Sequence, residues 1–144
     1  MIKEAESADV EKLAGLAVLL WPENTVQDLT DEFTEILLSE KGSFFLKVVQ
    51  DVPVGFAQCQ LRQDYVEGTG SRPVGYLEGI FVKEEYRRRG YAGELLHACE
   101  NWAKRKGCTE FASDCEIGNR DSFAFHMAFG FTETNRIICF TKQL

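Results

Sequence analysis

Apolar residues recur at helical spacing in two segments near the start of the chain. The first segment, residues 10–20, predicts a helix that ends at Trp21. The second segment opens at Thr25, a residue type that caps helices, and ends near Lys41. Residues 2–5, which precede both helices, are expected to form a short edge strand.

After the second helix, β-branched and aromatic residues become frequent. Residues 43–50 and 54–66 predict two strands joined by a hairpin turn, and residues 74–82 predict a third strand after a polar loop. Gly79 interrupts the third strand, and we expect either a bulge or a close backbone approach there.

Helical and strand patterns alternate in the last part of the chain. Residues 90–106 predict a long helix that ends at a C-cap glycine, and residues 119–129 predict a shorter one. Residues 108–114 predict a strand between them, and residues 135–144 predict a closing strand. The predicted order is β-α-α-β-β-β-α-β-α-β. It indicates a single α/β domain over residues 1–144, with a mixed sheet and helices packed on it.

The composition is that of an ordinary globular protein. The chain has 144 residues, 44% hydrophobic and 12% aromatic, and no apolar run reaches the roughly 18 residues that a membrane span needs. The first residues lack the basic and apolar regions of a signal peptide. Five scattered cysteines without a C-x-x-C pair argue against a disulfide framework and a zinc site. We therefore expect a reducing, cytoplasmic location and no metal.

The net charge of −7 restricts the partners of this protein. A pI near 4.9 disfavours nucleic acid, because phosphate contacts need a basic face. The same acidic surface attracts cationic ligands. We therefore expect cationic ligands, and neither nucleic acid nor a membrane as partner.

Three consecutive arginines, Arg87–Arg89, precede the predicted helix at residues 90–106. A helix N-terminus presents unpaired N–H groups and a partial positive charge. Gly90, Ala92 and Gly93 would let an anion approach these groups closely, and arginine adds bidentate donors. The stretch indicates a pyrophosphate-binding turn, although it has neither a Walker A nor a Rossmann pattern. The alternative is a solvated basic helix start.

Arg87-x-x-Gly90-x-Ala92 after an apolar strand resembles the R/Q-x-x-G-x-G/A signature of the GNAT superfamily of N-acetyltransferases. The order of elements also resembles that of the family, and the segment from Asn119 to Phe131 is similar to its second coenzyme-binding segment. The resemblance implies a mixed, mostly antiparallel sheet flanked by helices, with acetyl-coenzyme A as cosubstrate. The coenzyme-binding residues that it implies are Ile80, Phe81, Val82, Arg87, Arg88, Arg89, Gly90, Tyr91, Ala92, Gly93 and Asn119. Ile80 and Val82 also fit an ordinary strand core.

Five further segments are similar to the aminoglycoside 6'-N-acetyltransferases within this superfamily. These segments are residues 20–22, 62–68, 73–82, 110–114 and 130–134. The resemblance implies acetyl transfer to the 6'-amine of an aminoglycoside, and hence antibiotic resistance. The acceptor-binding residues that it implies are Trp21, Tyr65, Glu78, Asp114 and Glu133.

The attacking amine is protonated at neutral pH, so a base or a water relay must remove a proton from it. We expect Glu78 and Asp114 to serve there and to bind a cationic substrate. Each of them also fits a solvated surface charge, and Trp21 also fits a core position. His126 lies where many family members have a tyrosine proposed to protonate the coenzyme thiolate. It is a candidate general acid, or a helix residue hydrogen-bonded near the coenzyme.

Two other functions stay open on the sequence alone. The acceptor could be another amine, such as a polyamine, a small metabolite or a protein amino group. The chain could also be a non-catalytic acyl-coenzyme A sensor, since fold does not fix function. The apolar strand predicted at residues 135–144 needs covering, so we expect a homodimer that uses this region.

Overall fold

The computed structural model describes residues 1–144, with five strands and four α-helices. The strands are β1 (Ile2–Glu4), β2 (Gly42–Val49), β3 (Val52–Arg62), β4 (Val74–Val82) and β5 (Phe111–Ala112). The α-helices are α1 (Val10–Leu20), α2 (Val26–Ser39), α3 (Tyr91–Arg105) and α4 (Arg120–Ala128). Short 3₁₀ turns precede α1 and follow β4. Every predicted element except the last strand is present, in the predicted order.

The strands form one mixed sheet in chain order, β1-β2-β3-β4-β5. Neighbouring strands are antiparallel except β4 and β5, which are parallel. The register between β3 and β4 shifts so that Gln58 faces Gly79 while Cys59 faces Leu77. Glu78 therefore has no partner in the ladder. The irregularity predicted at Gly79 is confirmed, and it involves a candidate site residue.

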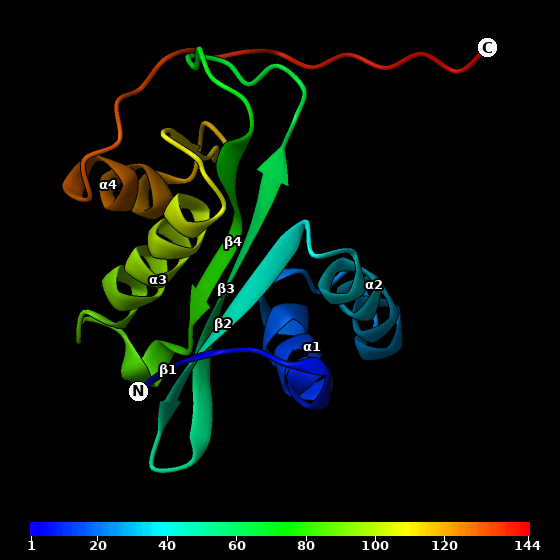
Figure 1. Cartoon of the computed structure of the whole chain (residues 1–144), viewed down its shortest axis with the longest axis vertical. Helices are drawn as coiled ribbons and strands as arrows, with labels where there is room; N and C mark the ends of the chain where they lie inside the picture. The colour runs from blue at the N-terminus through cyan, green and yellow to red at the C-terminus, as the bar shows by residue number, and fades with distance from the viewer.

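Helices cover both faces of the sheet (Figure 1). α1 and α2 pack on one face, where Leu13, Phe33 and Phe56 are among the buried side chains. α3 packs on the other face, where Leu95 and Trp102 belong to a second buried cluster. The central strands are thus fixed from both sides. None of the helices combines the length and the apolar character needed to cross a membrane.

Two predicted strands have other bounds in the structure, and a third is absent. β3 ends at Arg62 rather than at residue 66, because its partner β4 begins only at Val74. β5 comprises two residues rather than residues 108–114. Residues 135–144 form no strand and lie exposed, extending away from the sheet (Figure 1). A strand needs partners for its N–H and C=O groups, and no segment of the chain pairs with this tail.

Candidate functional site

β4 has strand partners on both sides only at its beginning. β5 pairs with it at Gly75 and Tyr76 and no further. Beyond Tyr76 the edge of β4 that faces β5 carries backbone groups without a strand partner, as the edge of a sheet does. Ile80, Phe81 and Val82, which the resemblance implied as coenzyme-binding residues, lie along this open edge.

The arginine turn leads from β4 to α3. Arg88 and Gly90 have positive φ angles of 63° and 81°, a conformation that glycine adopts without strain. No side chain caps the first turn of α3. The amide groups of residues 91–93 therefore have no partner within the helix, and they are available to an anion.

None of the three arginines forms an ion pair with a carboxylate. Arg87 Nε donates to the Val82 carbonyl at 2.8 Å, and Arg89 donates to the Glu85 carbonyl at 3.3 Å. Arg88 makes no hydrogen bond within the chain. In a protein with 23 acidic residues, these positive charges beside a helix N-terminus favour anion binding over a merely solvated helix start.

Two residues of the predicted coenzyme site also have packing or capping contacts. A Cβ atom added at Gly93 would lie 2.6 Å from the ring of Phe129, so glycine allows α4 to pack against α3. Asn119 is the N-cap of α4, and its side-chain oxygen accepts a hydrogen bond from the Ser122 amide at 3.1 Å. A coenzyme contact by Asn119 stays a prediction.

His126 is held by hydrogen bonds on both ring nitrogens. Nδ1 lies 2.6 Å from the Ser122 carbonyl oxygen, which can only accept, so Nδ1 carries a proton. Nε2 lies 2.8 Å from Ser113 Oγ. Ser113 follows β5, and its Oγ is 3.5 Å from the Leu77 carbonyl of β4. His126 therefore reaches the point where the two strands part through Ser113, a residue that sequence reasoning missed.

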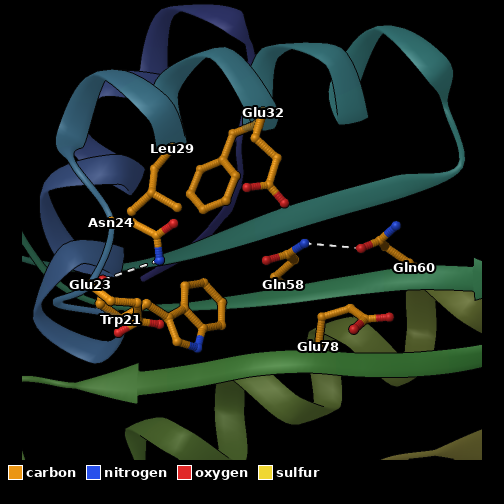
Figure 2. A pocket seen from close by; sticks show the side chains of 9 residues that line it. Trp21, Glu23, Asn24, Leu29, Glu32, Gln58, Gln60 and Glu78 are labelled. Atoms are coloured by element: carbon orange, nitrogen blue, oxygen red, sulfur yellow. Dashed lines mark hydrogen bonds between the residues drawn. The ribbon is translucent and has the colours of Figure 1, made fainter. Parts of the chain in front are cut away.

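A cavity of about 330 Å³ lies between α2 and the sheet (Figure 2). Its lining residues are Trp21, Glu23, Asn24, Leu29, Glu32, Phe33, Gln58, Gln60 and Glu78. The Glu32 side chain extends from α2 toward the sheet, Glu78 comes from β4, and the Trp21 ring lies against Gly79 of the same strand (Figure 2). Three carboxylates, no lysine or arginine, and an indole ring make this pocket suited to a cation.

The structure brings Glu78 and Asp114 to the same region through contacts with two other residues. Glu78 pairs with Arg62 at 2.9 Å, and Asp114 accepts a hydrogen bond from the Tyr76 hydroxyl. Burial, and then the contact with Asp114, raise the pKa of Tyr76 well above its usual value. Tyr76 therefore stays protonated and remains the donor in this hydrogen bond.

Tyr65 and Glu133 do not line the cavity. Tyr65 is 67% exposed in the loop after β3, and Glu133 pairs with Arg136 near the start of the tail. Their two segments meet where Gly68 packs against Thr134. An acceptor role for Tyr65 and Glu133 stays a prediction.

Sequence reasoning missed five polar lining residues, namely Glu23, Asn24, Glu32, Gln58 and Gln60. A signal for the two glutamines was present. Gln58, Gln60 and Arg62 alternate along β3, so their side chains share one face of a strand that is otherwise largely buried. Polar residues on the core face of a central strand indicate a pocket.

Comparison with known proteins relates this geometry to one family. A model of the acetyltransferase (GNAT) family matches residues 13–131. The aminoglycoside N(6')-acetyltransferase type 1 of Serratia marcescens is 39% identical over 145 residues, which cover 100% of this chain and 99% of the relative. The corresponding protein of Acinetobacter genomosp. 13 is 42% identical over 132 residues, which cover 90% of this chain and 89% of the relative.

A solved structure with the same fold contains a ligand. It is that of AAC(6')-Iy in complex with the bisubstrate analog CoA-S-monomethyl-acetylneamine. The TM-score is 0.95 at 38% sequence identity, and the match covers 100% of this chain and 98% of the other. The mixed sheet flanked by helices is thus that of an acetyltransferase.

Gly79→Ala is expected to displace Trp21 from the wall of the cavity, because the added Cβ would lie 2.6 Å from the indole ring. The expected loss of stability is about 1–3 kcal/mol, as for other overpacked sites. Denaturant unfolding and tryptophan fluorescence would measure both effects. Gly70→Ala is the matched control, since nothing lies within 4 Å of its added Cβ. Equal stability of the two variants would contradict this packing.

Proposed function

This chain belongs to the acetyltransferase (GNAT) family, and we propose that it transfers the acetyl group of acetyl-coenzyme A to the 6'-amino group of aminoglycosides, conferring antibiotic resistance. One observation carries the proposal: β4 joins two complementary sites. Its open edge leads to the cationic start of α3, and Glu78 on the same strand lines an acidic pocket. An anionic donor and a polycationic acceptor would therefore meet beside this strand.

The donor end fits the diphosphate of coenzyme A. The amide groups of residues 91–93 would bind phosphate oxygens, and Arg88 and Arg89 would add charge-assisted hydrogen bonds. The backbone of residues 80–82 would bind an extended arm as a sheet edge binds an extended chain. When bound, acetyl-coenzyme A supplies an acetyl thioester, which is activated for attack by an amine.

The acceptor end fits a sugar that carries several ammonium groups. Glu23 and Glu32 form no ion pair in the structure, so both charges are available to a substrate. Gln58, only 4% exposed, donates to Gln60 at 3.0 Å and directs its carbonyl oxygen into the cavity (Figure 2). Trp21 offers an apolar and π-rich surface to a sugar ring and its cationic substituents.

Two sets of residues would handle protons. Glu78 and Asp114 would bind the acceptor ammonium and take up its proton, directly or through water. His126 and Ser113 would donate a proton to the departing coenzyme thiolate. Their Nε2 and Oγ atoms are 2.8 Å apart, so a proton can pass from a charged His126 to Ser113 and into the opening between β4 and β5.

The direct test is the release of free thiol from acetyl-coenzyme A with matched acceptors. Kanamycin, tobramycin and neomycin carry a 6'-amine and are expected to support turnover, with one acetyl group gained per product molecule. Paromomycin, which carries a 6'-hydroxyl group, is the matched control and is expected to support none. Equal thiol release with neomycin and paromomycin would refute 6'-transfer. The absence of turnover with any amine would favour an acyl-coenzyme A sensor.

We also propose a cytoplasmic homodimer assembled through residues 135–144. In the single chain Ile137, Ile138 and Phe140 are 73%, 81% and 87% exposed, which is unusual for such side chains. A tail with this composition gains ladder partners and burial if it pairs with a second copy. The five cysteines are all free thiols, which suits a reducing compartment.

Sedimentation at micromolar concentration tests the assembly. The full chain is expected to sediment at about twice its mass of 16.3 kDa, whereas a variant that lacks residues 135–144 is expected to be a monomer. Substituting Ile137 and Phe140 with serine gives a milder control that keeps the chain length. A full-length protein that sediments as a single chain would contradict the proposal.

A further inference from the structure

Arg62 is a cation beside the acidic pocket, where it pairs with Glu78. It is the last residue of β3 and shares a strand face with Gln58 and Gln60. Its Nε donates to Glu78 Oε1 at 3.1 Å, and its Nη2 donates to Oε1 at 2.9 Å and to Oε2 at 3.0 Å. Both oxygens of the Glu78 carboxylate are therefore bound by one planar group, which restricts the orientation of that carboxylate.

The same guanidinium group rests on Tyr76. Its central carbon lies 3.5 Å from the centroid of the Tyr76 ring, close enough for a cation–π contact. The hydroxyl of that ring donates to Asp114 Oδ2. Tyr76 remains a donor because its pKa is raised by burial and by Asp114. Four side chains thus form one continuous series of contacts, in the order Glu78, Arg62, Tyr76 and Asp114.

This series of contacts crosses the point where β4 and β5 diverge. Arg62 comes from β3, Tyr76 and Glu78 come from β4, and Asp114 follows β5. Tyr76 is the last residue of β4 that pairs with β5. Its hydroxyl therefore connects β4 to the segment that diverges from it. Each of the two carboxylates beside the opening therefore accepts hydrogen bonds from a neighbour: Glu78 from Arg62, and Asp114 from Tyr76.

We propose that Arg62 and Tyr76 are positioning residues that fix Glu78 and Asp114 relative to each other for binding and deprotonation of the acceptor amine. The inference deepens the proposed function and rests on it. Neither residue need touch the reacting atoms. Arg62 sets the plane of the Glu78 carboxylate, and Tyr76 binds one oxygen of Asp114 and leaves the other, Oδ1, to the acceptor.

A stabilising role alone does not explain Arg62. Its side chain is 42% exposed and that of Glu78 is 21% exposed. Ion pairs this accessible to water contribute little to folding stability. Substitution of Arg62 is therefore expected to leave the fold intact while it frees the Glu78 carboxylate to change its orientation. That difference separates a positioning role from a structural one.

The test compares Arg62→Gln with Arg72→Gln. Arg72 lies in the nearby loop, is exposed and forms no ion pair, so its substitution makes the same change in net charge. R62Q is expected to lower kcat/KM for tobramycin by about 10-fold to 100-fold, as misplaced groups commonly do. The KM for acetyl-coenzyme A and the thermal unfolding midpoint are expected to stay at the wild-type values. R72Q is expected to behave as wild type in every respect.

Two further variants test the mechanism of positioning. Arg62→Ala is expected to be partly rescued by free guanidinium ion at millimolar concentration, because the ion can occupy the place between Glu78 and the Tyr76 ring. Tyr76→Phe keeps the ring but removes the hydroxyl, so it is expected to lower kcat through Asp114 alone. The double variant R62Q/Y76F is expected to lose less activity than the product of the two single losses, since both residues act on one assembly.

Three results would overturn the inference. R62Q and R72Q with equal kcat/KM would show that Arg62 positions nothing. A lower KM for tobramycin in R62Q would show that Arg62 competes with the acceptor for Glu78. A fall in the activity of R62Q that is accompanied by a fall in its thermal unfolding midpoint would show a structural role. Each of these requires an active wild-type enzyme, so an inactive wild type would instead refute the proposed function.

Discussion

The parting of β4 from β5 after two paired residues is the constraint on which the rest of this site depends. Backbone N–H and C=O groups need partners, and beyond Tyr76 the edge of β4 has none from a neighbouring strand. The same divergence carries Ser113 and Asp114 away from the sheet, so their side chains reach the opening from the far side. After β4 the chain passes through a short 3₁₀ turn and the arginine turn into α3, which places an uncapped helix N-terminus near the end of the open edge.

The acceptor pocket depends on a second irregularity in the same strand. The register shift opposite Gln58 leaves Glu78 outside the ladder, and the absence of a side chain at Gly79 lets the Trp21 ring lie against the strand. Buried clusters on both faces of the sheet hold β3 and β4 in place. Polar side chains on such a rigid support keep their positions without a ligand, which favours binding of a multiply charged substrate.

Local patterns predicted the helices and the long strands, because those segments bury a periodic apolar face. They failed where pairing with a distant segment decides the outcome. β5 is short because β4 diverges from it after two paired residues. Residues 135–144 form no strand because no segment of the chain pairs with them. The arginine turn was found from its charge and its small residues at a helix N-terminus, and Glu78 was found through motif resemblance. Glu32 was missed because an acidic residue on an amphipathic helix normally faces water, and only the packing of α2 over the sheet places it in a pocket.

Binding of coenzyme A, measured by calorimetry on two glycine variants, tests the account most directly. Gly90 and Gly107 lie at opposite ends of α3, both with positive φ and with no atom within 4 Å of an added Cβ. Gly90→Asp and Gly107→Asp therefore introduce the same charge and similar backbone strain, but only the first puts a carboxylate beside the amide groups of residues 91–93. Wild type and G107D are expected to bind coenzyme A, and G90D is expected to lose binding. Equal affinity of all three proteins would contradict diphosphate binding at the start of α3.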